Sequence, residues 1–431
     1  MDMTLSRRVA SRSRTFAATA MGACLIAGCG TLPGGSGDSG GTVTVMTFAP
    51  EDTKATNMPG MTGMAKAYER YVNSKGGING RKLRVLTCNE KNTPSGAADC
   101  ARKAVAEKAV AVVGSYSQHG RAFMAPLEAE SIPFIGGYGV SSEEFQSPLS
   151  YPVNGGQPVL IAGAGHQLSR ACSQVALVRP DTLAADTLPV LLNAGLRANK
   201  MADASDIRAA EDSADFGPQA REALAHTSGT GKEKEKEKGC VTAVLGERTE
   251  TFFDAFRRTD AQRKKPQISS VLGSVSQALV DRTGGKESPF EGAYLTSWYP
   301  VATDPLWEPM RKVVAEFAFG DDTVDPDDSG AQTTWIAYTV LSEILKRFKE
   351  DEPVTGRTVK RALNESQPVN TGGLTPNLSW RYQDMRAVAG FPRIVNGRVT
   401  FQIVQAGRLV AQPGEQSLDM TPTLVTAPPM A

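Results

Sequence analysis

Apolar and polar positions along residues 60–137 alternate between helical and extended spacing. Met61, Met64, Tyr68 and Tyr71 recur every three or four residues, as one face of a helix requires. We expect strands at 83–88, 110–113 and 132–135, and helices at 93–105 and 121–130. Strands separated by helices of about ten residues predict an α/β fold with a parallel, doubly wound sheet. The extended run 42–48 is expected to start this sheet.

The same alternation returns after residue 170 and predicts a second sheet. Its strands are expected at 174–178, near 207, and at 241–245, 268–272 and 292–298, the last of which returns the chain to the first sheet. Its helices are expected at 188–198, after Asp215 and at 250–258, and later helices at 306–317, 337–348 and 355–364. A hairpin over 388–410 is expected to turn at Asn396-Gly397. The Pro- and Thr-rich stretch after Gln412 is expected to fray.

The N-terminus has the pattern of an export signal. Four arginines precede an apolar run, 16–27, that is too short to span a bilayer. The run ends in Ile26-Ala27-Gly28-Cys29, which resembles a bacterial lipobox, in which the cysteine becomes the first mature residue and carries lipid. An ordinary secretory signal with an incidental cysteine is the alternative. We therefore expect a signal peptide at 1–28, a lipidated Gly/Ser linker at 29–41, and a location at the outer face of the bacterial cytoplasmic membrane.

Composition and motifs limit the possible functions. The 431 residues suffice for two domains, and a net charge of +1 gives no electrostatic support for nucleic-acid binding. Outside the Gly/Ser linker the sequence contains no GxSxG motif, and it contains no Walker, HExxH or CxxC motif, so we expect neither an enzyme nor a cofactor. His119 lies near Ser115 and Ser117, which leaves a nucleophile and base as an alternative, although no orienting acid can be assigned. The charged run KEKEKEK at 232–238 is interpreted as a solvated loop.

The expected export places the cysteines of the mature chain, from a total of six, in an oxidising compartment. Cys24 leaves with the signal peptide and Cys29 carries the lipid, so four cysteines with three possible pairings remain. The favoured pairing joins a strand end to its facing helix and the starts of two strands: Cys88 with Cys100, and Cys172 with Cys240. Metal binding is the alternative, but no CxxC or nearby histidine supports it.

Three segments in order carry a resemblance to a known family. YVNSKGGINGRKLRV, AVVGSYS and SIPFIGG resemble the first lobe of the branched-chain amino-acid-binding family. These are type I periplasmic binding proteins, the solute receptors of ABC importers. The resemblance implies two doubly wound parallel-sheet lobes joined by three crossovers. The expected parts are lobe 1 at 42–153 and 291–379, lobe 2 at 154–290, a hairpin on lobe 2 at 380–412 and a flexible tail at 413–431.

The resemblance also implies where a ligand would bind. In that family the loop that matches Gly114–Ser117 holds the ligand's carboxylate through hydroxyls and amides at a helix start, which makes Ser115, Tyr116 and Ser117 candidates. A simple helix cap is the alternative. Ser141 is the match at the next strand end, where Tyr138 and Glu143 depart from the family pattern.

In the second lobe an ammonium group would need an acidic partner, for which Glu247 or Asp254 could serve. Ser274, Trp298 and Tyr299 end strands there, and Trp298 could close over an apolar group of the ligand. The candidate ligand-binding residues are Ser115, Tyr116, Ser117, Tyr138, Ser141, Glu247, Ser274 and Trp298.

These observations predict a monomeric, membrane-anchored solute-binding lipoprotein that delivers a small polar ligand to ABC permease subunits. An amino acid or a related amide is the expected ligand. The alternative is a ligand-sensing or structural lipoprotein that kept the fold without transport, which the departures at Tyr138 and Glu143 would favour.

Overall fold

The structure of this protein is a computed structural model. It describes residues 41–53, 56–210, 213–227, 239–259, 266–271, 274–365, 367–386, 388 and 390–427, without the side chains of residues 183, 184 and 247. The expected signal peptide, the lipidation residue Cys29 and the KEKEKEK run all lie outside the described residues. Within the described part of the chain, no helix is long and apolar enough to cross a membrane.

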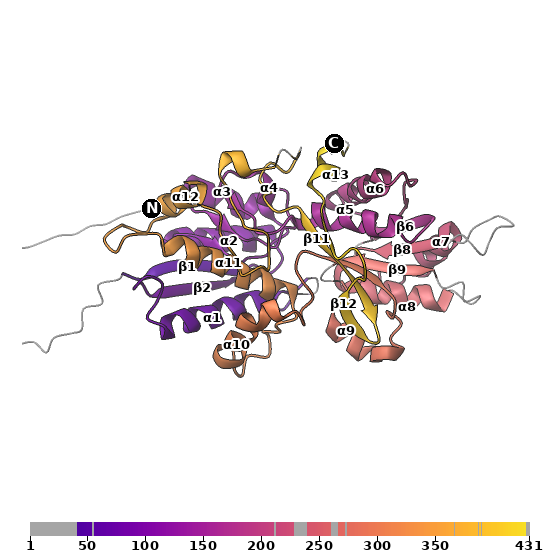
Figure 1. Ribbon diagram of the computed structural model, residues 1–431, viewed down its shortest axis with the longest axis horizontal. Coiled ribbons are helices and arrows are strands. Elements are labelled where there is room, and N and C mark those ends of the chain that lie inside the picture. The colour runs from indigo at the N-terminus through magenta and orange to yellow at the C-terminus, as the bar shows by residue number, and fades with distance from the viewer. Residues whose placement is uncertain are drawn as a thin grey trace, which may run out of the picture. The chain divides into compact units, whose positions relative to one another are not determined.

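The first sheet has five parallel strands in the order β2-β1-β3-β4-β5. They are β1 (Val43–Ala49), β2 (Leu83–Asn89), β3 (Val112–Val113), β4 (Phe134–Ile135) and β5 (Ser150–Tyr151). The accompanying helices are α1 (Pro59–Ser74), α2 (Pro94–Ala106), α3 (Gly120–Ala129), α4 (Glu143–Gln146), α10 (Glu308–Phe317), α11 (Ser329–Leu345) and α12 (Gly356–Glu365). Figure 1 shows helices on both faces of this sheet.

Alternation along β1 explains this layering. Val43 and Val45 point to the side that holds α1 and α11, whereas Met46 and Phe48 point to the side that holds α2 and α3. Successive side chains of a strand face opposite sides of the sheet, so a strand buried on both faces is apolar throughout. The sheet, its helices and these two apolar layers are called the first lobe below.

The second sheet contains eight strands in the order β12-β11-β10-β9-β8-β6-β7, with β13 paired to β11. They are β6 (Gln174–Pro180), β7 (Ser205–Ala209), β8 (Gly239–Ala243), β9 (Gln267–Val271), β10 (Tyr294–Ser297), β11 (Arg398–Gln405), β12 (Arg408–Ala411) and β13 (Ser417–Asp419). The helices are α5 (Gly156–Ser169), α6 (Thr187–Ala198), α7 (Gly217–Thr227), α8 (Thr249–Thr259), α9 (Gln277–Arg282) and α13 (Thr421–Val425). Short 3-10 turns are η1 (Leu183–Asp186), η2 (Gly246–Arg248), η3 (Gly285–Glu287), η4 (Pro305–Trp307) and η5 (Tyr382–Asp384). This sheet and its helices are the second lobe.

The strand expected at 292–298 does not return the chain to the first sheet. β10 pairs in parallel with β9 and antiparallel with β11, so it belongs to the second sheet. The chain returns to the first lobe after Trp298. The segment of the second lobe that precedes this connection therefore extends beyond the expected boundary at 290. Strand periodicity specifies a buried strand but not its neighbours, which explains the difference.

The C-terminal region differs from expectation in two further ways. The hairpin β11–β12 turns at Ala406-Gly407, both with positive φ, and the expected turn at Asn396-Gly397 instead lies before β11. The stretch expected to fray forms β13 and α13, which bury Met420 and Leu424 against the core. Proline at the first turn of a short helix is compatible with order, so composition alone gave the wrong expectation there.

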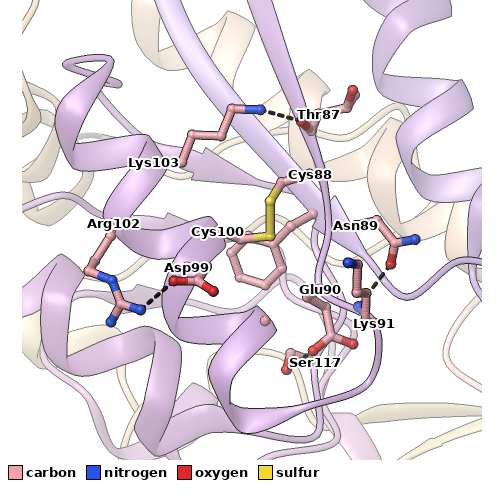
Figure 2. Close-up of a disulfide and its surroundings, with 12 residues drawn as sticks. Thr87, Cys88, Asn89, Glu90, Lys91, Asp99, Cys100, Arg102, Lys103 and Ser117 are labelled. Atoms are coloured by element: carbon pink, nitrogen blue, oxygen red, sulfur yellow. Dashed lines mark hydrogen bonds and ion pairs between the residues drawn. A yellow bond between two sulfur atoms is a disulfide. The ribbon is translucent and has the colours of Figure 1, made fainter.

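Both predicted disulfides are formed. Cys88 at the end of β2 is bonded to Cys100 in α2 (Figure 2). Cys172, just before β6, is bonded to Cys240 in the neighbouring strand β8. The metal-binding alternative for these four cysteines is therefore wrong.

The three connections between the lobes are bonded to one another. Asn154 Nδ2, in the first connection, donates to the hydroxyl of Tyr299 in the second at 3.1 Å. Trp380 Nε1 and Asn396 Nδ2, in the third, donate to the carbonyls of Pro152 and Val153 at 3.1 and 3.0 Å. These hydrogen bonds tie the three connections between the lobes to one another.

Candidate functional site

The loops at the carboxyl ends of β1, β3 and β4 meet at one edge of the first sheet. The amide of Tyr116 donates to the carbonyl of Phe48 at 3.0 Å, and that of Tyr138 donates to the carbonyl of Ser115 at 3.0 Å. The loops after β3 and β4 begin with glycines of positive φ, Gly114 and Gly136. A Cβ there would lie 2.9 Å from Thr334 and 2.3 Å from Ala337, so α11 can approach this edge only because these residues are glycine.

Ser115 and Ser117 lie together in the loop after β3, and both are buried. Ser115 Oγ accepts a hydrogen bond from the amide of Phe48 at 3.0 Å. Ser117 Oγ accepts a hydrogen bond from the amide of His119 at 3.1 Å. It donates to Glu90 Oε2 at 3.0 Å, and Figure 2 shows these two side chains together. Each predicted serine therefore has an internal partner as well as its place at the sheet edge.

Ser141 lies in the loop after β4, and its partner is also a carboxylate. Its hydroxyl donates to Glu144 Oε1 at 3.1 Å, and Glu144 additionally accepts from backbone amides of this loop. Burial raises the pKa of Glu144 to about 7, and the hydrogen bonds from Ser141 and Gly139 oppose that rise. Burial likewise raises the pKa of Glu90, although the bond from Ser117 and the nearby His119 counteract the effect.

Aromatic side chains from both lobes meet beside these loops. The ring of Tyr138 lies 5.3 Å from that of Tyr116 and 5.0 Å from that of Trp298, which follows β10. The Tyr138 hydroxyl is 2.7 Å from Ser329 Oγ at the start of α11, and Trp298 Nε1 donates to the carbonyl of Gly156 at 2.9 Å. Burial raises the pKa of Tyr116 to about 12, so its hydroxyl stays protonated at neutral pH.

The remaining second-lobe candidates are not brought to this cluster by any described contact. Ser274 is half-buried after β9, and its amide donates to the carbonyl of Val271. Glu247 belongs to η2, and its side chain lies outside the described atoms. Asp254 on α8 forms ion pairs with Arg257 and Arg258 of the same helix, which provides another role for its charge.

The arrangement around His119 does not assemble a nucleophile and base. Ser117 receives a hydrogen bond from the backbone amide of His119 rather than from its ring, and Nε2 of that ring is buried without a partner. Ser115 is bonded to Phe48. Across the described residues, no group of three or more His, Cys, Asp or Glu side chains could hold a metal ion.

Two buried carboxylates at this edge, Glu90 and Glu144, were missed from the sequence. Glu144 stands three residues after Ser141, the spacing of a capping box, so a local signal for its backbone contact was present. Glu90 becomes part of the site only because β2 and β3 flank β1, which no local pattern indicates.

Comparisons with known proteins agree with this architecture. A family model described as Periplasmic binding protein matches residues 52–391. No curated protein matches the chain in sequence.

Solved structures share the fold at low sequence identity. A possible leucine/isoleucine/valine-binding protein from Rhodopirellula baltica is 14% identical, with a TM-score of 0.68 over 90% of this chain and 99% of that one. A solute-binding protein of an ABC transporter from Rhodopseudomonas palustris, in complex with p-hydroxybenzoic acid, is 15% identical, with a TM-score of 0.68 over 90% and 99%. A branched-chain amino acid ABC transporter protein from Thermus thermophilus with bound valine is 13% identical, with a TM-score of 0.65 over 87% and 97%.

These matches confirm the resemblance inferred from the first-lobe segments and the α/β fold of two parallel-sheet lobes. At such identities the structural likeness shows the fold alone, whereas the family model spans most of the chain. The chain therefore belongs to the periplasmic binding protein family.

Proposed function

We propose that the protein is the solute-binding lipoprotein of an ABC importer and binds a small polar solute, an amino acid or a related amide, between its two lobes. The observation that carries this proposal is the meeting of the Tyr116 and Tyr138 loops of the first lobe with Trp298 of the second. Ligands of open α/β sheets bind outside the carboxyl ends of the strands, where these loops lie. The tied connections at Asn154 and Tyr299 supply a hinge about which the lobes would close on the solute.

The candidate contacts are those expected from the sequence. Tyr116, Tyr138 and Trp298 offer aromatic surface, and the loops that carry Ser115, Ser117 and Ser141 offer polar groups beside it. Glu247 and Ser274 remain candidates from the second lobe. Fold relatives described with bound valine and with p-hydroxybenzoic acid support a small organic solute as the ligand class.

Binding rather than catalysis is proposed for this site. Ser115 and Ser117 are bonded to the backbone and to Glu90, and neither is bonded to the ring of His119. The serine nucleophile and histidine base considered from the sequence would require a hydrogen bond from Ser115 or Ser117 to the ring of His119. Members of this family are solute-binding proteins outside the cytoplasm, and we assign this chain the same role.

The membrane anchor is a separate part of the proposal and rests on the lipobox-like sequence that ends at Cys29. We expect the wild-type chain to incorporate labelled fatty acid in a bacterial host and to fractionate with membranes. Cys29→Ala should lose both the label and the membrane association. Unchanged labelling of Cys29→Ala would contradict the anchor without touching the solute-binding role.

A thermal-shift screen of amino acids and their amides on the purified protein tests the ligand class. A binding solute stabilises the folded state by mass action, by about 2.7 kcal/mol at a hundredfold excess over Kd. At least one solute of the class should raise Tm, and Trp298→Ala should reduce that shift. A complete screen with no stabilising amino acid or amide would reject this ligand class.

A further inference from the structure

The loop Gly139–Ser141 directs three successive backbone amides at one carboxylate. The amide of Gly139 donates to Glu144 Oε2 at 2.9 Å, and those of Val140 and Ser141 donate to Oε1 at 3.0 Å each. The hydroxyl of Ser141 adds a fourth donor at 3.1 Å. Consecutive amides turned toward one point form a concave anion-binding nest of the kind that holds phosphates and carboxylates in other proteins.

Helix capping explains only part of this arrangement. A capping box pairs a glutamate with the amide three residues earlier, which accounts for the bond between Glu144 and Ser141. The amides of Gly139 and Val140 lie further from the helix and still point at the same carboxylate. Gly139 has a φ of +88°, and a Cβ there would lie 2.7 Å from the Cα of Gly156, so the loop takes this shape because the residue is glycine.

The carboxylate is enclosed as well as bonded. Glu144 is 2% exposed, and a Cβ on Gly137 would lie 2.0 Å from its Oε2. Among the described residues, no Lys, Arg or His forms an ion pair with it. An isolated buried carboxylate is costly unless hydrogen bonds satisfy it, and here four neutral donors do so.

In the neighbouring loop a serine hydroxyl also donates to a buried carboxylate, here with a single backbone amide beside it. Ser117 donates to Glu90, which is fully buried and also accepts from the amide of Asn92 at 3.0 Å. The hydroxyls of Ser117 and Ser141, which could otherwise hold an anionic solute, thus both donate to the protein's own carboxylates. A carboxyl group of the protein therefore lies behind each of them.

We infer that Glu144 is the anion for which the Gly139–Ser141 loop is built, and that this positioning residue excludes a solute's carboxylate from that loop. This second part rests on the proposed solute site, where it predicts a preference among solutes. A solute would present a neutral or N–H-bearing end to the loop, as an amide or amine does, because a carboxylate would find the donors taken and a like charge behind them.

Chemical rescue tests the first part without any solute. Glu144→Ala empties the nest, whereas Glu143→Ala removes the same side chain at the adjacent, partly exposed position and serves as the control. Tm is measured at about pH 8 in about 0.1 M sodium acetate and in an equal concentration of sodium chloride. We expect Glu144→Ala to have a lowered Tm that acetate, but not chloride, raises by several degrees. Wild type and Glu143→Ala should melt alike in the two salts. Acetate acting equally on all three proteins, or on none, would overturn the inference.

A second variant covers the case in which Glu144→Ala does not fold. Glu144→Gln keeps the shape of the side chain but removes the charge that the amides bind. Amide hydrogen exchange of Gly139, Val140 and Ser141 should then be at least about tenfold faster than in Glu143→Gln, since each would lose a charge-assisted bond of more than about 1 kcal/mol. Equal exchange in the two variants would show that the carboxylate does not hold the loop.

Matched solute pairs test the preference. Leucinamide and 4-hydroxybenzamide are compared with leucine and 4-hydroxybenzoate by thermal shift. In wild type at least one amide should stabilise more than its acid, and Glu144→Ala should narrow that difference. An acid that stabilises wild type as well as its amide does would overturn the preference. If no solute acts, the proposed ligand class fails, while the acetate experiment still decides the role of Glu144.

Discussion

The two lobes bury charge in opposite ways. At the edge of the first lobe, Glu90 and Glu144 are enclosed by hydrogen-bond donors that carry no charge. In the second lobe, the side chain of Arg179 on β6 is 1% exposed and is matched by two carboxylates. Its Nε and Nη2 donate to the two oxygens of Asp206 at 2.7 and 2.8 Å, and its Nη1 lies 3.0 Å from Asp186.

This difference distinguishes a buried charge with ion-pair partners from two buried carboxylates without them, beside the proposed site. Arg179 and Asp206 neutralise each other, so the pair leaves little net field around it. Glu90 and Glu144 form no ion pair with any described residue, and burial raises the pKa of each. Ionisable groups with displaced pKa values gather at functional edges, which agrees with the site proposed there.

The largest expected effect concerns the buried Arg179 of the second lobe. Arg179→Ala should lower the free energy of unfolding by about 3–5 kcal/mol, because the charge-assisted hydrogen bonds to Asp206 and Asp186 and the packing of a buried side chain would be lost together. Denaturant unfolding measures the loss. Arg208→Ala is the control, since Arg208 lies near the same carboxylates but is 55% exposed, so its ion pairs should contribute at most about 1 kcal/mol. Equal losses in the two variants would mean that burial of Arg179 does not set its contribution.

The disulfides also differ between the lobes. Cys172 and Cys240 are separated by 68 residues, whereas Cys88 and Cys100 are separated by 12. Replacing Cys172 and Cys240 by serine should lower the free energy of unfolding by about 4 kcal/mol, and replacing Cys88 and Cys100 should lower it by about 3 kcal/mol. The disulfide that closes the longer loop restricts the unfolded chain more. Unfolding of the two double variants gives the order, and a larger loss for the Cys88–Cys100 pair would contradict it.

The pH dependence of stability tests Glu144, the buried carboxylate of the first lobe. Because the folded-state pKa of Glu144 is raised from 4.5 to about 7, the folded protein holds this proton where the unfolded chain has released it. Stability from this group is therefore complete below about pH 4.5 and is lost as the pH rises through about 7. Relative to Glu144→Gln, the unfolding free energy of wild type should fall by about 3 kcal/mol across that window.

Urea unfolding at a series of pH values measures this difference, and effects of other carboxyl groups present in both proteins cancel. Glu143→Gln is the matched control and should keep the wild-type slope. A Glu144→Gln protein with the same pH slope as wild type would mean that Glu144 does not titrate differently in the folded state.

The smallest effect concerns the aromatic cluster. Tyr138→Phe removes a buried hydroxyl that is bonded to Ser329 and should cost about 1 kcal/mol. Tyr382→Phe removes a hydroxyl from a side chain that is 90% exposed and should leave Tm unchanged. Calorimetric melting of both variants measures the difference. No loss in Tyr138→Phe would mean that this bond does not hold the ring between Tyr116 and Trp298.

Much of the fold was predictable because its signals are local. The stripe of Met61, Met64 and Tyr68 and the apolar runs of the first sheet depend on neighbouring residues alone. The two disulfides were predicted by joining a strand end to its facing helix and the starts of two strands to each other. The sheet membership of β10 was not predictable in this way. Its residues read as a buried strand in either lobe, and its partner β11 comes about a hundred residues later in the chain.

The loops of the candidate site could be located from the sequence, but their hydrogen bonds could not. The positions of Ser115, Ser117 and Ser141 after strands were visible in the sequence, as was the capping-box spacing of Glu144. That Ser117 donates to Glu90 depends on the order of β2, β1 and β3 in the sheet. A sequence alone shows that such hydroxyls exist, but not which groups they are hydrogen-bonded to.

A crystal structure of the protein with the solute that most raises its Tm tests the central claim most directly. The account predicts density for the solute between the Tyr116–Tyr138 loops and Trp298, with Glu144 still bonded to the amides of residues 139–141. Density elsewhere on the protein, or a solute carboxylate on those amides with Glu144 displaced, would contradict it.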